Sequence, residues 1–290
     1  MLELSLAHAK QKLLSELKGL GIEASEAQRE TELIIFEVTG LSLAQQVLEE
    51  RRLITTHEET KLADILAKRK QRMPLQYCLG YTHFMKTKLT IFPGVFIPRS
   101  DTETVVTTAA KLLSHTASPS IAEIGIGSGA ISIALLIELP AAQIKAVDLS
   151  PEAIDLSRLN AMQNGVIDRL TLIAGDWREN LPMGLDAIIS NPPYIPRSQK
   201  DSLAPEVVNF EPELALFGDD PDGLSFYRAF IKIAPNHLKD DGLVVLEFGD
   251  RQDNALHQMF IDAGWRGVVI HKDMSARPRV ISAVRPIKSP

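Results

Sequence analysis

The chain has 290 residues, of which 45% are hydrophobic and 23% are charged, a composition typical of a globular protein with one large and one small domain. The net charge of −6 argues against broad binding to a nucleic-acid backbone. The single cysteine, Cys78, excludes an internal disulfide. The chain also has neither an apolar run long enough to span a bilayer nor a signal-like amino terminus, so we expect a cytoplasmic protein without membrane contact.

Residues 1–73 show only helical patterns, and we expect them to form a small all-α domain. An apolar stripe near the amino terminus is closed by Gly19 and consists of Leu2, Leu6, Leu13, Leu14 and Leu17. Later helix starts have the spacing of a capping box at three places, Ser25 with Gln28, Ser42 with Gln45, and Thr56 with Glu59. Met73-Pro74 ends the last of these helices, so a linker is predicted over 74–98.

The linker contains an expected β-hairpin. Its first strand would alternate polar and apolar residues over 87–91, Pro93-Gly94 would turn the chain, and residues 95–97 would return it. After the linker, Ser100 and Glu103 form another capping-box pair, which predicts a helix that runs to about Leu113.

From Ser120 onward, strand and helix patterns alternate. Strands are predicted over 121–124, 143–147, 170–173, 185–189 and 243–248, with helices that begin near Ser128, Pro151 and Gly223. Such alternation is typical of an α/β fold, in which helices cover both faces of a mostly parallel sheet. Residues 267–271 and 280–284 are predicted to form a final antiparallel pair.

The most informative stretch is Asn191-Pro192-Pro193-Tyr194, directly after the predicted strand at 185–189. The carboxyl end of a strand in an open α/β sheet is where ligands bind. Asn191 carries an amide, and the prolines hold their carbonyls in fixed directions, so the stretch offers several acceptors beside an aromatic ring. This chemistry suits a planar NH2 group. For the tetrapeptide alone, a Pro-Pro turn without chemistry is an equal alternative.

A glycine-rich loop joins the first strand of the sheet to its helix. Its glycines allow a tight turn and leave room for a ligand against the backbone, so its members are candidate cofactor-binding residues. These are Gly125, Ile126, Gly127, Ser128 and Gly129. The loop also fits the dinucleotide-binding pattern, and by itself it does not select a cofactor.

Three further residues have two interpretations each. Asp148, after the second strand, is placed to bind ribose hydroxyls or to help cap the next helix. Trp177, which follows Asp176 after the third strand, could stack on an adenine or pack in the core. Glu123 could orient a cofactor or be an ordinary carboxylate at a strand end. Coincidence of all these features at one sheet edge is improbable, and we expect a binding site there.

This ordered set resembles the class I S-adenosylmethionine-dependent methyltransferases, and Asn-Pro-Pro-Tyr is typical of the branch that methylates planar nitrogens. More of the chain is similar to the bacterial release factor glutamine methyltransferases of HemK or PrmC type. The similar stretches are 74–80, 97–103, 191–195, 210–216 and 222–224. Ile126 departs from the threonine usual in that family, and Ser275-Ala276-Arg277-Pro278 lacks its expected glycine.

The resemblance implies a Rossmann-like methyltransferase domain over 99–290, with a mostly parallel sheet of about seven strands and an antiparallel last strand. It also implies S-adenosyl-L-methionine as cofactor and N5-methylation of the glutamine in the Gly-Gly-Gln motif of class 1 peptide chain release factors. Asn191, Pro192 and Tyr194 would be catalytic, Pro193 would help to bind the substrate, and Asn191 would also contact the cofactor. The helical domain would recognise the protein partner.

Other expectations concern what the protein lacks. The 7 histidines show no metal-ligand spacing, so no metal is expected, and we expect a monomer without direct nucleic-acid binding. Two alternatives remain open from the sequence. One is methylation of an exocyclic amine of a nucleic acid, and the other is a non-catalytic module that binds a dinucleotide or RNA.

Overall fold

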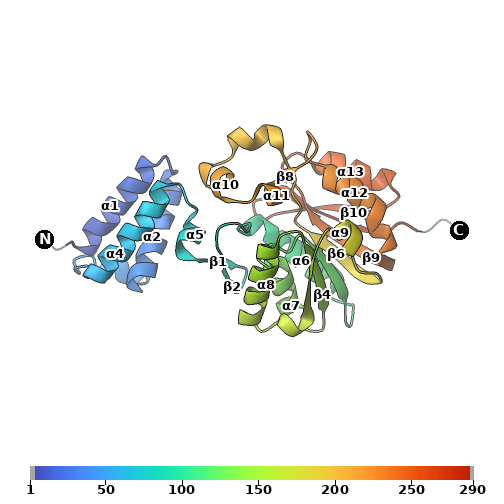
Figure 1. Cartoon of the computed structure of the whole chain (residues 1–290), viewed down its shortest axis with the longest axis horizontal. Helices are drawn as coiled ribbons and strands as arrows, with labels where there is room; N and C mark the ends of the chain where they lie inside the picture. Colours follow the sequence, from blue (N-terminus) through green and yellow to red (C-terminus); the bar gives the residue numbers. More distant parts are fainter. Residues whose placement is uncertain (1–3, 288–290) are drawn as a thin grey trace. The chain divides into compact units, whose positions relative to one another are not determined.

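A computed structural model describes residues 4–287. The chain forms two compact units (Figure 1). One unit contains the chain up to Gly80 together with Pro205–Phe210, and the other contains Tyr81–Ala204 together with the chain from Glu211 onward. Among the described residues, no helix has both the length and the apolar character needed to cross a bilayer.

The regular elements described in the first unit are helices, and an isolated antiparallel bridge joins Ser5 to Leu53. The apolar stripe predicted near the amino terminus faces its core, where Leu6, Leu13 and Leu17 are buried, while Leu2 lies outside the described residues. Ile34 and Ile35 of the next helix complete the centre of this core. The helices are α1 (Leu6–Gly19), α2 (Ala24–Thr39), α3 (Leu43–Leu48), α4 (Thr56–Lys70), α5 (Leu75–Leu79) and α10 (Pro205–Phe210).

The capping box predicted at Ser42 and Gln45 is confirmed, because each side chain bonds the backbone N–H of the other at the start of α3. The box predicted at Ser25 and Gln28 is wrong. Glu23 precedes α2 instead, and its carboxylate accepts hydrogen bonds from the first free N–H groups of the helix. A carboxylate at this position also complements the positive end of the helix dipole.

The box predicted at Thr56 and Glu59 is wrong by one residue, since Thr55 and Glu58 form it at the start of α4. Glu58 also forms an ion pair with Arg52, at 2.7 Å. Glu58, which Arg52 also binds, therefore takes the third helical position in place of Glu59, and the cap falls on Thr55.

The hairpin of the linker differs from its prediction. The strand at 87–90 pairs with the segment before it rather than with residues 95–97, so β1 (Tyr81–Phe84) and β2 (Thr87–Thr90) are antiparallel partners. The chain reverses at Met85, which has a φ of 49°, and Pro93-Gly94 makes a separate turn. Val95 and Ile97 are buried and lie outside the β1–β2 hairpin.

The predicted cap at Ser100 and Glu103 is also wrong. Residues Ser100–Thr102 form the 3-10 helix η1, and α6 (Glu103–Leu113) follows it without a side-chain cap. The Glu103 carboxylate accepts a hydrogen bond from Met85 N at 2.8 Å. It therefore binds the turn of the hairpin and not the backbone N–H of Ser100, as a capping box would require.

The second unit contains a seven-stranded sheet in the order β10-β11-β9-β6-β3-β4-β5. Strands β5, β4, β3, β6 and β9 are parallel, whereas β11 is antiparallel to both of its neighbours. The predicted strands and the antiparallel end are thus confirmed. The strands are β3 (Ser120–Ile124), β4 (Gln143–Asp148), β5 (Leu170–Ala174), β6 (Leu185–Ser190), β9 (Leu238–Glu247), β10 (Arg266–Lys272) and β11 (Pro278–Val284).

Helices cover both faces of this sheet (Figure 1). One core lies between the sheet and α6, α7 (Ala130–Glu138) and α8 (Pro151–Gln163). The other lies beneath α9 (Trp177–Asn180), α12 (Ser225–Ile233) and α13 (Asp253–Asp262). The remaining elements are short, namely η2 (Ile167–Arg169), β7 (Ile195–Pro196), η3 (Arg197–Ser202), α11 (Glu213–Leu216), β8 (Phe217–Gly218) and η4 (Ala234–Asn236).

Candidate active site

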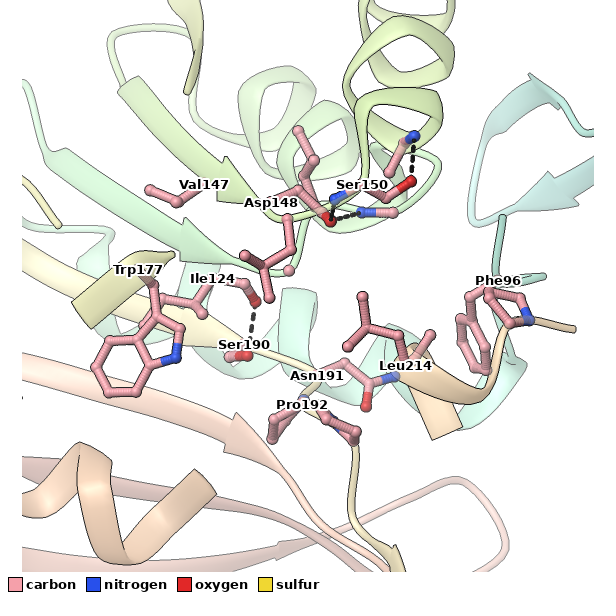
Figure 2. Close-up of a pocket in the computed structure, with 18 of the residues that line it drawn as sticks. Phe96, Ile124, Val147, Asp148, Ser150, Trp177, Ser190, Asn191, Pro192 and Leu214 are labelled. Atoms are coloured by element: carbon pink, nitrogen blue, oxygen red, sulfur yellow. Dashed lines mark hydrogen bonds between the residues drawn. The ribbon is translucent and has the colours of Figure 1, made fainter. Parts of the chain in front are cut away.

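The carboxyl ends of β3, β4, β5 and β6 meet at one edge of the sheet, as parallel neighbours must. A cavity of about 590 Å³ opens there, within the second unit. Its walls come from the four loops that follow these strands and the helix starts beside them, from parts of 94–98 and 212–219, and from Thr102 and α12. Trp177 and Phe96 lie toward opposite ends of the cavity, with Asn191 between them (Figure 2).

The glycine-rich loop forms one wall. Gly127 has a φ of +54°, and a Cβ placed there would meet no atom within 4 Å, so the glycine leaves open space beside the backbone. Gly129 is different, because its Cβ would lie 2.9 Å from Ile133 Cδ1 and 3.3 Å from Ser157 Cβ, and it lies outside the cavity lining. One glycine therefore leaves room at the cavity, while the other allows close packing of the loop on α7 and α8.

Hydrogen bonds to β4 and α8 fix the backbone of the rest of the loop. Gly125 N donates to Val147 O at 2.8 Å, and the Ser128 carbonyl accepts from Asn160 Nδ2 of α8 at 2.8 Å. Ile126, where the similar family usually has threonine, is buried and belongs to the hydrophobic core. Its apolar side chain fits this environment.

Asp148 is bound to the glycine loop. Its Oδ2 accepts from Gly127 N, and its Oδ1 accepts from Ser150 N, each at 2.9 Å (Figure 2). Ser150, and not Asp148, is the N-cap residue of α8, because its hydroxyl accepts from Ala153 N. The carboxylate thus lies in the cavity wall between the loop and the start of the helix.

Glu123 is buried at the carboxyl end of β3 and lines the cavity. The hydroxyl of Ser132 donates a hydrogen bond to its carboxylate. Burial nevertheless raises the pKa of Glu123 to about 8, so that its side chain is mainly neutral near pH 7.

Trp177 lines the cavity and also packs against the core. Its ring lies 5.4 Å from that of Phe226 and 6.2 Å from that of Phe230, measured between centroids. The two interpretations of this tryptophan are therefore compatible. Asp176 precedes it as the N-cap of α9, and the Arg178 guanidinium beside it holds the pKa of this carboxyl below its usual value.

The tetrapeptide begins where β6 ends. Ser190 Oγ donates to Ile124 O at 2.7 Å, which ties this end of β6 to β3 (Figure 2). Asn191 Nδ2 donates to Thr102 Oγ1 at 3.0 Å, so the amide is held with its oxygen available as an acceptor. Pro192 and Pro193 line the cavity beside it. The structure brings these three residues together with the glycine loop, Asp148 and Trp177.

Tyr194 is placed differently from the other members of the tetrapeptide. It is not among the residues that line the cavity, and its hydroxyl donates to Glu247 Oε1 at 3.0 Å. Burial raises the pKa of the phenol above its ordinary value. The ring therefore contacts the interior behind the loop, and stacking of this ring on a substrate stays a prediction that this arrangement does not favour.

Sequence reasoning assigned no role in the site to several polar residues of this region, although some of them lie in the stretches similar to the family. Glu247 is buried at the end of β9, and Gln252 is buried at the start of α13. Thr102 contacts Asn191, and Glu211 accepts hydrogen bonds from Ile97 N and the Arg99 side chain. The rule that located the site, polar residues at the carboxyl end of a parallel strand, also applies to Glu247 and could have identified it.

Comparisons with known proteins agree with this architecture. The family described as Methyltransferase small domain matches residues 87–210, and the one described as PrmC N-terminal domain matches residues 8–80. A release factor glutamine methyltransferase of Geobacter sulfurreducens is 36% identical over 264 residues, which cover 90% of this chain and 90% of the relative. The chain belongs to the release factor glutamine methyltransferase family. A second member, from Caulobacter vibrioides, is 35% identical over 94% of each chain.

Other similar proteins are longer or more distant. The chain covers 44% of a bifunctional methyltransferase of Rickettsia bellii, at 36% identity over 244 residues or 75% of this chain, so it spans less than half of that relative. The solved hMettl16 catalytic domain, in complex with MAT2A 3'UTR hairpin 6, is 14% identical, with a TM-score of 0.55 over 82% of this chain and 86% of that one. This likeness shows the shared fold alone.

Membership of the family makes the chain a methyltransferase that uses S-adenosylmethionine as methyl donor. The cavity fits such a ligand. Its volume of about 590 Å³ lies within the range of small-molecule sites. Gly125 and Gly127 both leave open space where a side chain would begin, which gives a ligand access to the loop backbone. The walls supply carboxylates, an indole ring and apolar surface, groups that suit ribose, amine and adenine.

Proposed function

We propose that the chain methylates N5 of the glutamine side chain in the Gly-Gly-Gln motif of class 1 peptide chain release factors. The family relation over 90% of the chain supports this reaction. The observation that carries it is the placement of Asn191, whose side chain is fixed by Thr102 and lies in the wall of the same cavity as the glycine loop. An acceptor held in this way is suited to a planar NH2 group.

The chemical difficulty is that an amide nitrogen delocalises its lone pair into the carbonyl and is a poor nucleophile. S-adenosylmethionine supplies an electrophilic methyl group. Asn191 Oδ1 and the Pro192 carbonyl would accept hydrogen bonds from the NH2 group and hold the nitrogen in line for attack. These acceptors stabilise the transition state more than the ground state, since positive charge develops on the nitrogen during transfer. The proton would then leave to solvent.

The cofactor-binding residues follow from the cavity walls. We assign Gly125, Ile126, Gly127 and Ser128 of the loop to the methionine part of the cofactor, Asp148 to its ribose hydroxyls and Trp177 to its adenine. Gly129, also predicted from the sequence to bind the cofactor, would instead support the loop from outside the cavity. Asn191 would contact both cofactor and substrate from its place between the two ends of the cavity (Figure 2). The opposite end, with Phe96 and Leu214, would receive the glutamine side chain.

The remaining parts of the proposal concern the whole protein. The predicted domains are a helical domain over 1–73, a linker over 74–98 and a methyltransferase domain over 99–290, and the helical domain would recognise the release factor. The protein would act as a cytoplasmic monomer without direct contact with nucleic acid. The net charge of −6 supports the last point, because phosphate-backbone binding depends on basic surfaces.

Mass spectrometry tests the proposal. A purified class 1 release factor is incubated with S-adenosylmethionine and either the wild-type chain, Asn191→Ala, or the control Asn254→Ala, which alters an exposed asparagine of α13. We expect one added methyl group on the glutamine of Gly-Gly-Gln. The Asn191→Ala rate should be lower by roughly 10²-fold, and the control rate unchanged. Labelling of RNA or DNA, with an unmodified release factor, would instead support methylation of a nucleobase.

A further inference from the structure

Gln252 makes three hydrogen bonds to backbone groups of three separate segments. Its Oε1 accepts from Gly249 N at 2.8 Å, and its Nε2 donates to Tyr194 O at 3.0 Å and to Asp222 O at 2.9 Å. The side chain is buried, with 7% of its surface exposed. One carboxamide thus joins the end of the tetrapeptide to the turn after β9 and to the turn before α12.

This carboxamide has no role in its own helix. Gln252 is the N-cap residue of α13, yet its side chain makes no capping hydrogen bond. Its hydrogen-bonding capacity is directed away from the helix, toward the tetrapeptide and its neighbours.

Two glycines allow the close contact around Tyr194. A Cβ on Gly223 would lie 2.1 Å from Tyr194 O, and one on Gly249 would lie 2.9 Å from Tyr194 Cδ2 and 3.0 Å from Gln252 Oε1. The backbone of Tyr194 therefore lies close against Gly223, and its ring lies close against Gly249. The Tyr194 carbonyl thus packs against Gly223 and also accepts the hydrogen bond from Gln252.

The peptide between Tyr194 and Asn191 is stiff, because Pro192 and Pro193 have fixed φ angles. Its other end is held where Ser190 Oγ donates to Ile124 O. Because two of the φ torsions between these residues are fixed, a displacement at Tyr194 would shift the acceptors at Asn191 and Pro192.

We propose that Gln252 is a positioning residue for methyl transfer, which fixes the Tyr194 backbone and thereby sets the direction of the Asn191 side chain and the Pro192 carbonyl. The inference rests on the proposed function. Gln252 acts through the tetrapeptide and does not line the cavity itself. Its removal should therefore reduce the rate of transfer more than it weakens cofactor binding, since a small misplacement of reacting groups lowers a rate strongly.

The test compares Gln252→Met with Gln258→Met, the same substitution at an exposed position of the same helix. For each protein, kcat and KM are measured with a release factor, and the Kd for S-adenosylmethionine is measured by calorimetry. For Gln252→Met we expect kcat to fall by roughly tenfold or more, with Kd within twofold of wild type. A fall in kcat of less than fivefold overturns the inference. A rise in the Kd for S-adenosylmethionine as large as the fall in kcat also overturns the inference, because Gln252 would then act by stabilising the fold.

A second variant, Gln252→Glu, adds a readout that a purely structural role would not affect. Its ionised carboxylate would face two carbonyl oxygens, whereas its protonated form can donate to one of them. The ratio of its kcat to that of wild type should rise at least threefold as pH falls from 8.5 to 6, and a constant ratio contradicts the inference. Failure of the wild-type chain itself to methylate the factor would contradict the proposed function, so the two failures are distinguishable.

Discussion

The Tyr194 hydroxyl donates a hydrogen bond to Glu247 Oε1, and this contact joins the tetrapeptide to a carboxyl group that is 1% exposed. Glu247 Oε2 is buried without a hydrogen-bond partner among the described residues. Burial raises the pKa of Glu247 to about 7, against the opposing effects of the Thr102 and Tyr194 hydroxyls and of Arg279, while nearby Asp101 acts in the same direction as burial. The carboxyl behind the active-site loop is therefore close to half-protonated at neutral pH.

This pKa makes the stability of the protein depend on pH. The usual glutamate value is 4.5, so between pH 4.5 and 7 the folded chain binds more protons at Glu247 than the unfolded chain does. The stabilisation is present below pH 4.5 and is lost as pH rises through 7. Relative to Glu247→Gln, we expect the wild type to lose roughly 2 kcal/mol of unfolding free energy between pH 5 and 8.5. Urea unfolding at both values measures this, and parallel changes in the two proteins would contradict it.

The carboxamide of Asn160 supports the cofactor loop. Its Nδ2 donates to Ser128 O at 2.8 Å and to Thr90 O at 3.0 Å, and its Oδ1 accepts from Thr90 N at 2.8 Å. Asn160→Ala leaves the buried Ser128 carbonyl and the half-buried Thr90 backbone without these bonds, so we expect the Kd for S-adenosylmethionine to rise by roughly fivefold or more. Gln163→Ala is the control, because Gln163 contacts the exposed Thr90 hydroxyl but not the loop. Equal affinities in calorimetry would refute this role.

The two glycines of the loop should respond differently to alanine. Gly129→Ala would place a Cβ 2.9 Å from Ile133 Cδ1 at a φ of +87°, so we expect a loss of roughly 1–3 kcal/mol of stability. Gly127→Ala meets open space and should cost about 1–2 kcal/mol through its φ alone. Its methyl group would occupy room at the cavity, however, and the Kd for S-adenosylmethionine should rise by roughly tenfold. Thermal unfolding and calorimetry on both variants separate the two effects, and unchanged cofactor affinity in Gly127→Ala would contradict the assignment.

Arg69 is buried in the helical unit, with its Nε and Nη2 each 2.9 Å from the Glu30 carboxylate and its Nη2 3.2 Å from Glu206 Oε1. Burial raises the pKa of Glu30, against the opposing effect of Arg69. Arg69→Met leaves the buried Glu30 carboxylate without this partner, whereas the half-buried Glu206 keeps its ion pair with Arg72. We expect a loss of roughly 3–5 kcal/mol in urea unfolding. Lys68→Met, which removes an exposed pair with Asp64, should cost about 0.5 kcal/mol or less. Equal losses in the two variants would show that burial of the pair does not matter.

Much of the fold could be predicted because it depends on local pattern. The strands of the sheet are short apolar runs between turn signals, and their alternation with helices indicated the parallel sheet and the edge where ligands bind. The errors come from contacts between residues distant in the sequence. Glu103 was expected to cap its own helix, but its carboxylate accepts a hydrogen bond from Met85 N. The hairpin turns at Met85, and methionine is not a residue type typical of turns.

Prediction of the site was also limited by contacts between residues that are distant in the sequence. The residue types in the cavity wall were predictable, since Asn191, Asp148, Trp177 and the glycine loop all follow strands at one edge. The direction of the Tyr194 side chain was not, because its partner Glu247 lies 53 residues later on β9. Gln252 has no motif that identifies it, and only the folded chain shows that one carboxamide contacts three turns.

The membership of Pro205–Phe210 in the helical unit has a consequence for any attempt to divide the gene. The chain passes between the units after Gly80, before Pro205 and again after Phe210, so a single cut does not yield two complete pieces. A fragment that ends at Gly80 lacks Glu206, the partner of Arg72 at 2.6 Å. Exchange of the helical part between relatives therefore requires two coordinated insertions, and recombination at one crossover point would produce mismatched proteins.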